Sequence, residues 1–230
     1  MSIEMEDDGI IDIDEYDRDD PQFVTEYVDD IFSYLKGKES ELQLGDYITA
    51  IQVEIKPRHR NLLVAWMTQV YYQLRLLSET LMLAVRIVDR ALSARPVARK
   101  KLQLVGVGAL IIASKFEEMH CPPLADFKFC SDFVYTEAEM LRIERILLNT
   151  LGFNLCLPSP LIFLRRYSKA AGSDSTTHTL SKYLTELSCL DYSLLQFSDS
   201  KVAAAAVFLA RRMRGISPTW DRCLEYYTEY

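Results

Sequence analysis

Apolar positions recur along most of the chain at the three- and four-residue spacing of amphipathic helices, but residues 102–118 follow a different pattern. From Leu104 to Ala113 all ten residues are apolar or glycine, and a charged cluster follows. A helix that is apolar all round is either buried by neighbours on every side or spans a membrane. Because spanning takes about 20 apolar residues, the pattern predicts a central buried helix over about 98–118 in an all-α domain.

Amphipathic or capped segments surround this central helix in the sequence. Thr136 with Glu139 forms a capping box, Gly152 is the matching helix stop, and Ser78 is the predicted cap of another helix. Residues 39–57 read as extended. The predicted helices of this first set cover residues 22–39, 58–77, 78–95, 122–132 and 136–152.

The pattern restarts after a linker at 154–160. Residues 106–115 and 203–212 are both rich in small residues, and each follows a long amphipathic segment. We interpret this as an internal duplication of a five-helix unit with a buried third helix, whose second copy lacks a fifth helix and is truncated. The predicted helices of this second set cover residues 160–171, 176–197, 201–213 and 220–230.

Charge is distributed unevenly. The net charge is −7, yet residues 1–20 hold ten acids and one base, so the remaining 210 residues are close to neutral at +2. The acidic stretch is predicted to be a disordered, solubilising tail, with a site for a basic partner as the less favoured alternative. The near-neutral remainder argues against nucleic-acid binding.

Catalytic and metal-binding patterns do not emerge from the sequence. It contains no P-loop, GxGxxG, HExxH or GxSxG motif. Glu117 and Glu118 are adjacent and diverge by about 100° on a helix, which makes them a poor catalytic pair. Five scattered cysteines indicate reduced thiols inside a cell, and His120, Cys121 and Cys130 do not complete a zinc site. We expect no enzyme activity, cofactor, metal or membrane partner.

Many short motifs, in order, are similar to those of mitotic cyclins, with the B type closest. They are HRNLLVAW (59–66), RLLSETLMLAVRIVDR (75–90), LQLVG (102–106), ASKFEE (113–118), FLRRYSK (163–169), KYLTELSCLDY (182–192) and KVAAAAVFLA (201–210). The resemblance covers about residues 22–230. It implies two tandem cyclin folds after an N-terminal helix, with an acidic tail at 1–20, a lead-in at 21–57, a first fold at 58–153 and a truncated second fold at 154–230.

The resemblance also implies a function. A chain of this family is a regulatory subunit that binds and activates a cyclin-dependent protein kinase by fixing its αC helix, here with an expected role at G2/M in nucleus and cytoplasm. Lys115 and Glu144 match the charged residues that grip that helix; from spacing alone they would read as ordinary solvated charges. Further kinase-facing positions are Phe116, Phe153, Leu155, Tyr27, Ile31 and Tyr34.

Two other sets of residues carry family roles. A groove that docks Arg-x-Leu substrates or inhibitors is matched by Leu62, Leu63, Trp66, Gln69 and Gln103. His59 stands where the family usually has Met, and Ala65 where it usually has Asp, so the groove is expected to persist with an altered preference or to be lost. Arg60 and Asp89 match a structural ion pair.

Two other functional hypotheses stay open on the sequence. One is a non-activating cyclin-fold adaptor in transcription, and the other is a plain helical scaffold. The short acidic stretch shows no RxxL destruction box, and the RxxL matches at 60–63, 99–102 and 145–148 fall inside predicted packed helices. Regulated destruction through such a signal is therefore not expected.

Overall fold

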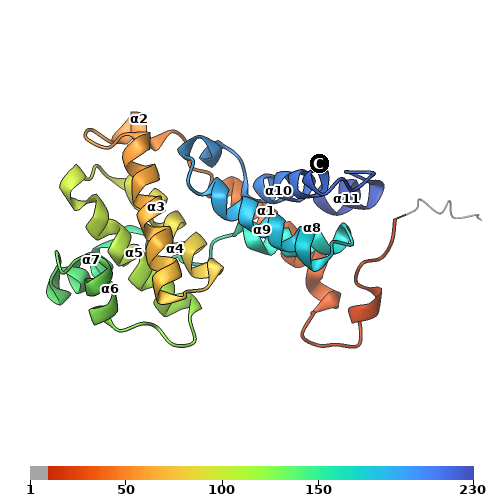
Figure 1. Cartoon of the computed structure of the whole chain (residues 1–230), viewed down its shortest axis with the longest axis horizontal. Coiled ribbons are helices and arrows are strands. Elements are labelled where there is room, and N and C mark those ends of the chain that lie inside the picture. Colours follow the sequence, from red (N-terminus) through yellow and green to blue (C-terminus); the bar gives the residue numbers. More distant parts are fainter. Residues whose placement is uncertain (1–9) are drawn as a thin grey trace, which may run out of the picture. The chain divides into compact units, whose positions relative to one another are not determined.

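A computed structural model describes residues 10–230, and every regular element within them is a helix, as predicted. The chain forms two compact units (Figure 1). The first unit holds residues 43–159 and 186–196, and the second holds residues up to 42 together with 160–185 and 197–230. Among the described residues, no helix combines the length and apolarity needed to cross a membrane.

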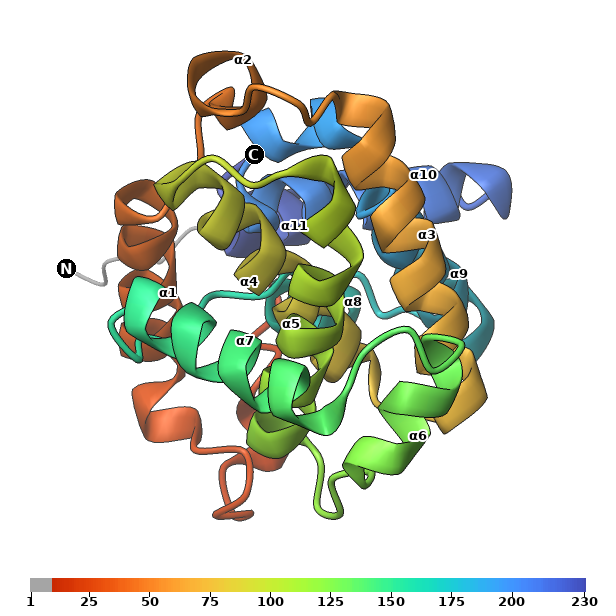
Figure 2. The same cartoon turned by 90° about the vertical axis from the view of Figure 1, so that its left-hand side faces the viewer.

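The first unit is built around α5 (Leu102–Glu117), in which every residue from Leu104 to Ser114 is buried. The predicted central helix is thus confirmed. Figure 2 shows its neighbours around it. They are α3 (Pro57–Leu74), α4 (Ser78–Ala94), α6 (Leu124–Cys130) and α7 (Glu137–Thr150). The unit also contains α2 (Tyr47–Ile51) and the 3₁₀ turns η3 (Arg99–Lys101) and η4 (Tyr192–Gln196).

Glycines let α5 approach its neighbours closely. A Cβ atom at Gly108 would lie 2.8 Å from Cγ2 of Ile143 and 3.0 Å from Cδ1 of Leu147, both on α7. At Gly106 it would lie 2.8 Å from Cδ1 of Leu63 on α3. The two glycines, at sequence spacing i and i+2, therefore set the distance of α5 from two different helices.

Several local predictions can be compared with these elements. The Thr136–Glu139 capping box forms at the start of α7, and Gly152 follows that helix with φ +59°. Residues 39–57 are not simply extended, because Asp46 accepts the Thr49 N–H and caps α2. The long helix predicted over 176–197 ends at Ser188 and continues as η4, where Tyr192 bonds to other parts of the first unit.

The second unit contains α1 (Val28–Glu41), α8 (Pro160–Ala170), α10 (Asp199–Met213), α11 (Arg222–Thr228), most of α9 (Ser175–Ser188) and the turns η1 (Glu15–Asp17) and η2 (Thr25–Tyr27). Buried alanines on α10 allow α8 to pack closely on it. Unlike α5, α10 is buried on one side only, since Phe208, Leu209 and Met213 are exposed. The predicted third helix of the second repeat is therefore buried on the side that faces α8 and exposed on the other.

The acidic segment differs from the predicted tail in its described part. Residues 1–9 lie outside the described residues, but residues 10–20 include η1 and the buried side chain of Asp14. Two cations on α8, the buried Arg166 and the partly exposed Lys169, provide the physical reason, because they attract the acidic side chains of this segment.

Gly108→Ala should destabilise the first unit, since the added methyl group meets the branched side chain of Ile143. Overpacking of this kind costs about 1–3 kcal/mol, which outweighs the gain of up to about 1 kcal/mol in helix propensity. The matched control is Gly37→Ala in α1, where a Cβ meets nothing within 4 Å. Urea unfolding should show the first variant less stable than the parent and the second more stable; equal gains in both would contradict the close approach.

Candidate functional site

Lys115 and Glu144 meet where α5 leaves the core. The Lys115 Nζ donates a hydrogen bond to Oε1 of Glu144 at 2.6 Å, which joins the end of α5 to α7. The Glu144 side chain is 11% exposed and the Lys115 side chain 47%. Because the carboxylate is buried and the ammonium group is half open, the pair is held in place yet has donors left for a partner molecule.

The end of α5 is fixed by a second carboxylate. Oε1 of Glu118 accepts the Leu77 N–H at 2.7 Å and the Thr80 hydroxyl at 2.6 Å. A carboxylate at this position satisfies unpaired N–H groups and complements the dipole of α4. The predicted cap, Ser78, is instead buried and donates to Glu186. Glu118 therefore anchors the chain three residues after Lys115.

Two aromatic side chains close to these elements in the sequence are exposed. Phe116 is 48% exposed at the end of α5, and Phe153 is 66% exposed just after α7. Gly152 and Phe153 both adopt left-handed backbone conformations, with φ +59° and +58°, and the Phe153 N–H donates to the Leu148 carbonyl at 3.0 Å. The turn thus directs Phe153 to the surface, whereas Leu155 is partly buried against the core.

The remaining predicted kinase-facing residues lie in the second unit. Tyr27 ends η2, and Ile31 and Tyr34 follow on α1. All three are exposed, at 54%, 41% and 62%. Their spacing of four and three residues places them on one face of the helix.

The residues predicted for the docking groove all lie in the first unit but are not equally accessible. Leu62 is 69% exposed, Gln69 is exposed and Trp66 is partly buried, and their spacing places these three on one face of α3. Leu63 is buried and packs on Gly106 instead. Gln103, at the start of α5, accepts a hydrogen bond from the Tyr135 hydroxyl at 3.3 Å.

One of the two departures from the family pattern, His59, has a local explanation. The His59 ring is buried, and its Nδ1 accepts the Lys56 N–H at 3.1 Å, so it caps α3 from within. Burial, followed by nearby Arg99, lowers the pKa of His59. Ala65 is partly buried on α3. His59 therefore acts as a neutral structural residue rather than as an exposed replacement for methionine.

Arg60 and Asp89 form a buried ion pair between α3 and α4. Nε and Nη2 of Arg60 donate to the two Asp89 oxygens at 3.0 and 2.7 Å, and both side chains are 1% exposed. The Tyr47 hydroxyl donates to the same carboxylate at 2.7 Å. Burial, and then the Asp89 charge, raise the pKa of Tyr47 far above its usual range.

Arg60 also holds the segment 186–196, a connection that the sequence did not reveal. Its Nη1 donates to the Cys189 carbonyl. The Tyr192 N–H donates to Asn61 at 3.2 Å, and its ring stands edge-on to Tyr47 at 5.2 Å. Contacts to a backbone carbonyl or to the edge of an aromatic ring have no sequence motif. The only signal in the sequence was the position of Arg60 among apolar neighbours, which indicates that a buried Arg60 needs polar partners.

Comparison with known proteins identifies two family models. The model "Cyclin, N-terminal domain" matches residues 30–156, and "Cyclin, C-terminal domain" matches residues 158–230. Both models describe cyclin domains, and together they cover almost all of the described residues.

Curated relatives are similar over nearly the whole chain. The G2/mitotic-specific cyclin-B of Dictyostelium discoideum is 50% identical over 220 residues, which are 95% of this chain and 50% of the relative. The G2/mitotic-specific cyclin cdc13 of Schizosaccharomyces pombe is 46% identical over 95% of this chain and 45% of the relative. The G2/mitotic-specific cyclin-B2 of Rana japonica is 43% identical over 96% of this chain and 56% of the relative. The chain thus spans about half the length of these relatives.

Two solved structures share the fold. A viral cyclin from herpesvirus saimiri has a TM-score of 0.77 at 20% identity, covering 87% of this chain and 90% of its own. The yeast RNA Pol II CTD kinase CTDK-1 complex contains a chain with a TM-score of 0.64 at 12% identity, covering 81% and 63%. At these identities the likeness establishes the cyclin fold alone.

Asp89→Ala should strongly destabilise the first unit, because it leaves the Arg60 guanidinium buried without its counter-charge. Breaking such a pair typically costs about 3–5 kcal/mol. Urea unfolding measures this loss. The control, Asp126→Ala on the exposed surface of α6, should cost at most about 1 kcal/mol. An Asp89→Ala protein as stable as the parent, with only partner binding reduced, would assign the pair to a contact surface.

Proposed function

Because the chain belongs to the cyclin family and matches G2/mitotic B-type members along nearly its whole length, we propose that it is a regulatory subunit of a cyclin-dependent protein kinase, acting at G2/M. The observation that carries the proposal is the Lys115–Glu144 pair at the exit of the buried helix. It requires no catalytic group on this chain. All five cysteines are free thiols, which fits a reducing environment inside the cell, and we place the protein in nucleus and cytoplasm.

Activation follows from selective binding. A protein kinase is active when its αC helix is positioned so that the αC glutamate pairs with the strand β3 lysine. A rigid surface that binds only this arrangement shifts the kinase population toward it. Lys115 would donate to groups at the end of that helix, and its position is fixed by Glu144 on one side and by the anchored end of α5 on the other.

The energy needed shows why the charged pair cannot act alone. Shifting a two-state equilibrium from 1:99 to 99:1 requires about 5.5 kcal/mol of differential binding. A charge-assisted hydrogen bond contributes about 1.5–3 kcal/mol. Burying an exposed phenylalanine adds about 1.5–3 kcal/mol, so Phe116 and Phe153 together supply the remainder. Leu155, just after the same turn, belongs to this proposed kinase-binding surface. In the second unit, Tyr27 at the end of η2 and Ile31 and Tyr34 on α1 are proposed as further residues that contact the kinase.

Substrate selection is the second part of the proposal. Leu62, Trp66 and Gln69 form an exposed apolar and amide face on α3, and Gln103 adds a carbonyl acceptor near the start of α5. We propose that this face docks Arg-x-Leu segments of substrates or inhibitors. Leu63 contributes by spacing α3 from α5 rather than by direct contact, because it is buried against Gly106.

Lys115→Ala should weaken binding and activation of a monomeric cyclin-dependent kinase by about 10- to 100-fold, as expected for loss of a charge-assisted contact. Histone phosphorylation and titration of the kinase measure the two effects. Lys100→Ala, an exposed lysine in η3 at the other end of α5, is the matched control and should behave like the parent. Full activation by Lys115→Ala would contradict this assignment.

Leu62→Ala should reduce the affinity for an Arg-x-Leu peptide by about tenfold without loss of stability, because the side chain is largely exposed. Trp66→Ala should reduce it further. Tyr226→Ala removes an exposed aromatic from α11 in the second unit and should have no effect. Fluorescence anisotropy of a labelled peptide provides the measurement. The groove would be refuted if the parent did not bind the peptide, or if the Leu62 and Trp66 variants bound it as tightly as the parent does.

A further inference from the structure

A cation that the proposed function does not use lies buried in the second unit. Arg166 on α8 is 7% exposed, and its guanidinium stacks between the rings of Phe32 at 5.5 Å and Tyr227 at 5.0 Å. Cation–π contacts of this kind favour the charged side chain but do not neutralise it. The arginine therefore needs an anion.

The anion at hydrogen-bond distance comes from the acidic N-terminal segment, while the exposed Asp29 on α1 lies 3.6 Å from Nη2 of Arg166. Nη1 of Arg166 donates to both oxygens of Asp14, at 2.7 and 2.5 Å, and Nζ of Lys169 donates to Asp14 at 2.6 Å and to Asp17 at 2.5 Å. The Asp14 side chain is only 12% exposed. Burial would raise the pKa of Asp14, but the hydrogen bonds from Arg166 and Lys169 lower it below its usual value.

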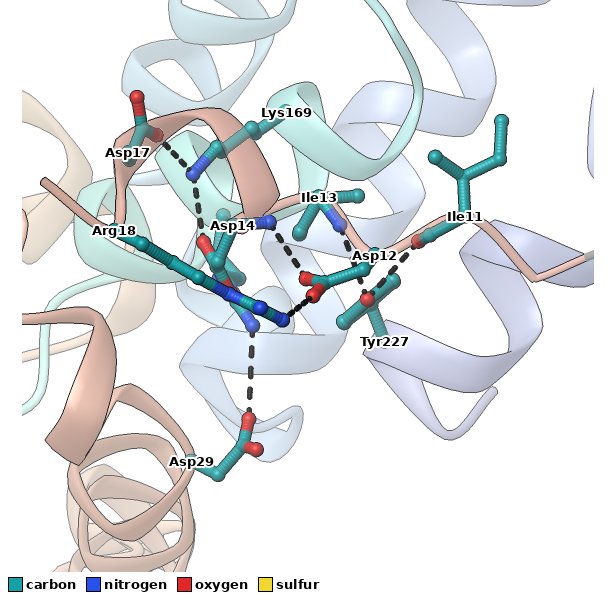
Figure 3. A network of polar contacts seen from close by, with 10 residues as sticks. Ile11, Asp12, Ile13, Asp14, Asp17, Arg18, Asp29, Lys169 and Tyr227 are labelled. Carbon is teal, nitrogen blue, oxygen red and sulfur yellow. Dashed lines mark hydrogen bonds and ion pairs between the residues drawn. The ribbon is translucent and has the colours of Figure 1, made fainter.

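The backbone of the segment is held as well. Figure 3 shows the Tyr227 hydroxyl between two backbone groups: it donates to the Ile11 carbonyl at 3.1 Å and accepts the Ile13 N–H at 3.3 Å. Asp12 shapes the turn by accepting the Asp14 N–H at 2.9 Å. Backbone pairing combined with selected side chains is how proteins commonly recognise extended peptides.

These contacts have the form of a receptor and a ligand within one chain. Arg166, Lys169 and Tyr227 belong to α8 and α11, whereas Asp14 and Asp17 are 152 residues distant from their cations in sequence. Residues 19–24 lead from the segment to η2, and all six are exposed, with the Phe23 ring 5.6 Å from Nζ of Lys169. We propose that α8 and α11 form a binding site for acidic peptides of the pattern Asp-x-x-Asp, which this chain fills with its own residues 11–17.

The site has two consequences for partners. A segment of another protein with two aspartates at the same spacing competes with residues 11–17 for Arg166 and Lys169. Because the chain's own segment is tethered, its effective concentration is on the order of millimolar, and a competitor binds well only when that segment is displaced or altered. Added salt should weaken the ion pairs of the partly exposed Lys169 more than the ion pair between the buried Arg166 and Asp14.

The test uses the full chain carrying Asp14→Ala and Asp17→Ala, and a labelled peptide of residues 10–18. The peptide should bind this variant at least about tenfold more tightly than the parent, whose site is filled. The same peptide with Asp14 and Asp17 changed to asparagine should not bind. Glu15→Ala with Asp19→Ala removes two charges from exposed positions of the same segment but neither contact, and this control should behave like the parent. Equal binding to all three proteins would overturn the proposal.

A second experiment applies even if the empty site prevents folding. A protease recognition sequence inserted between Asp20 and Pro21 allows the folded parent chain to be cut without emptying the site. The released N-terminal peptide should co-elute with the rest of the chain in gel filtration and be displaced by an excess of the peptide of residues 10–18. Immediate separation, with the remaining chain folded and unable to rebind the peptide, would show a tether without a binding site.

Discussion

A buried arginine must have a counter-charge, and in each unit of this protein such a pair joins segments that are distant in the sequence. In the first unit Asp89 pairs with Arg60, and α2, α3, α4 and the segment 186–196 meet at the pair. In the second unit Asp14 pairs with Arg166, and the acidic segment, α1, α8 and α11 meet there. Because an unpaired buried charge costs several kcal/mol, these pairs specify which distant segments must come together.

The first unit places its surface groups by means of one rigid helix. Gly106 and Gly108 bring α5 close to α3 and α7, so the predicted groove residues on α3 and the Lys115–Glu144 pair share one scaffold. Tight packing of this kind leaves little freedom at the end of α5, where Glu118 adds a further restraint. The proposed kinase contact and the proposed docking groove are therefore held at a fixed separation by core packing.

Features that arise from residues close together in the sequence could be predicted, whereas features that depend on distant residues could not. The central helix follows from the apolar run at 104–113, and the Thr136–Glu139 box from a three-residue spacing. The cap supplied by Glu118 and the role of Asp14 could not be predicted, because their partners lie 41 and 152 residues away. Lys115 and Glu144, 29 residues apart, were paired only through resemblance to a family. Composition identified the acidic segment as charged but not as a ligand.

Phe153 has a left-handed backbone conformation that lowers the stability of the isolated protein. A bulky residue with φ +58° pays about 1–2 kcal/mol that glycine would not, and its ring gains little from the fold because it is 66% exposed. On folding grounds alone a second glycine would be preferred after Gly152. The proposed contact with a kinase would give this exposed aromatic ring a use that offsets its backbone cost.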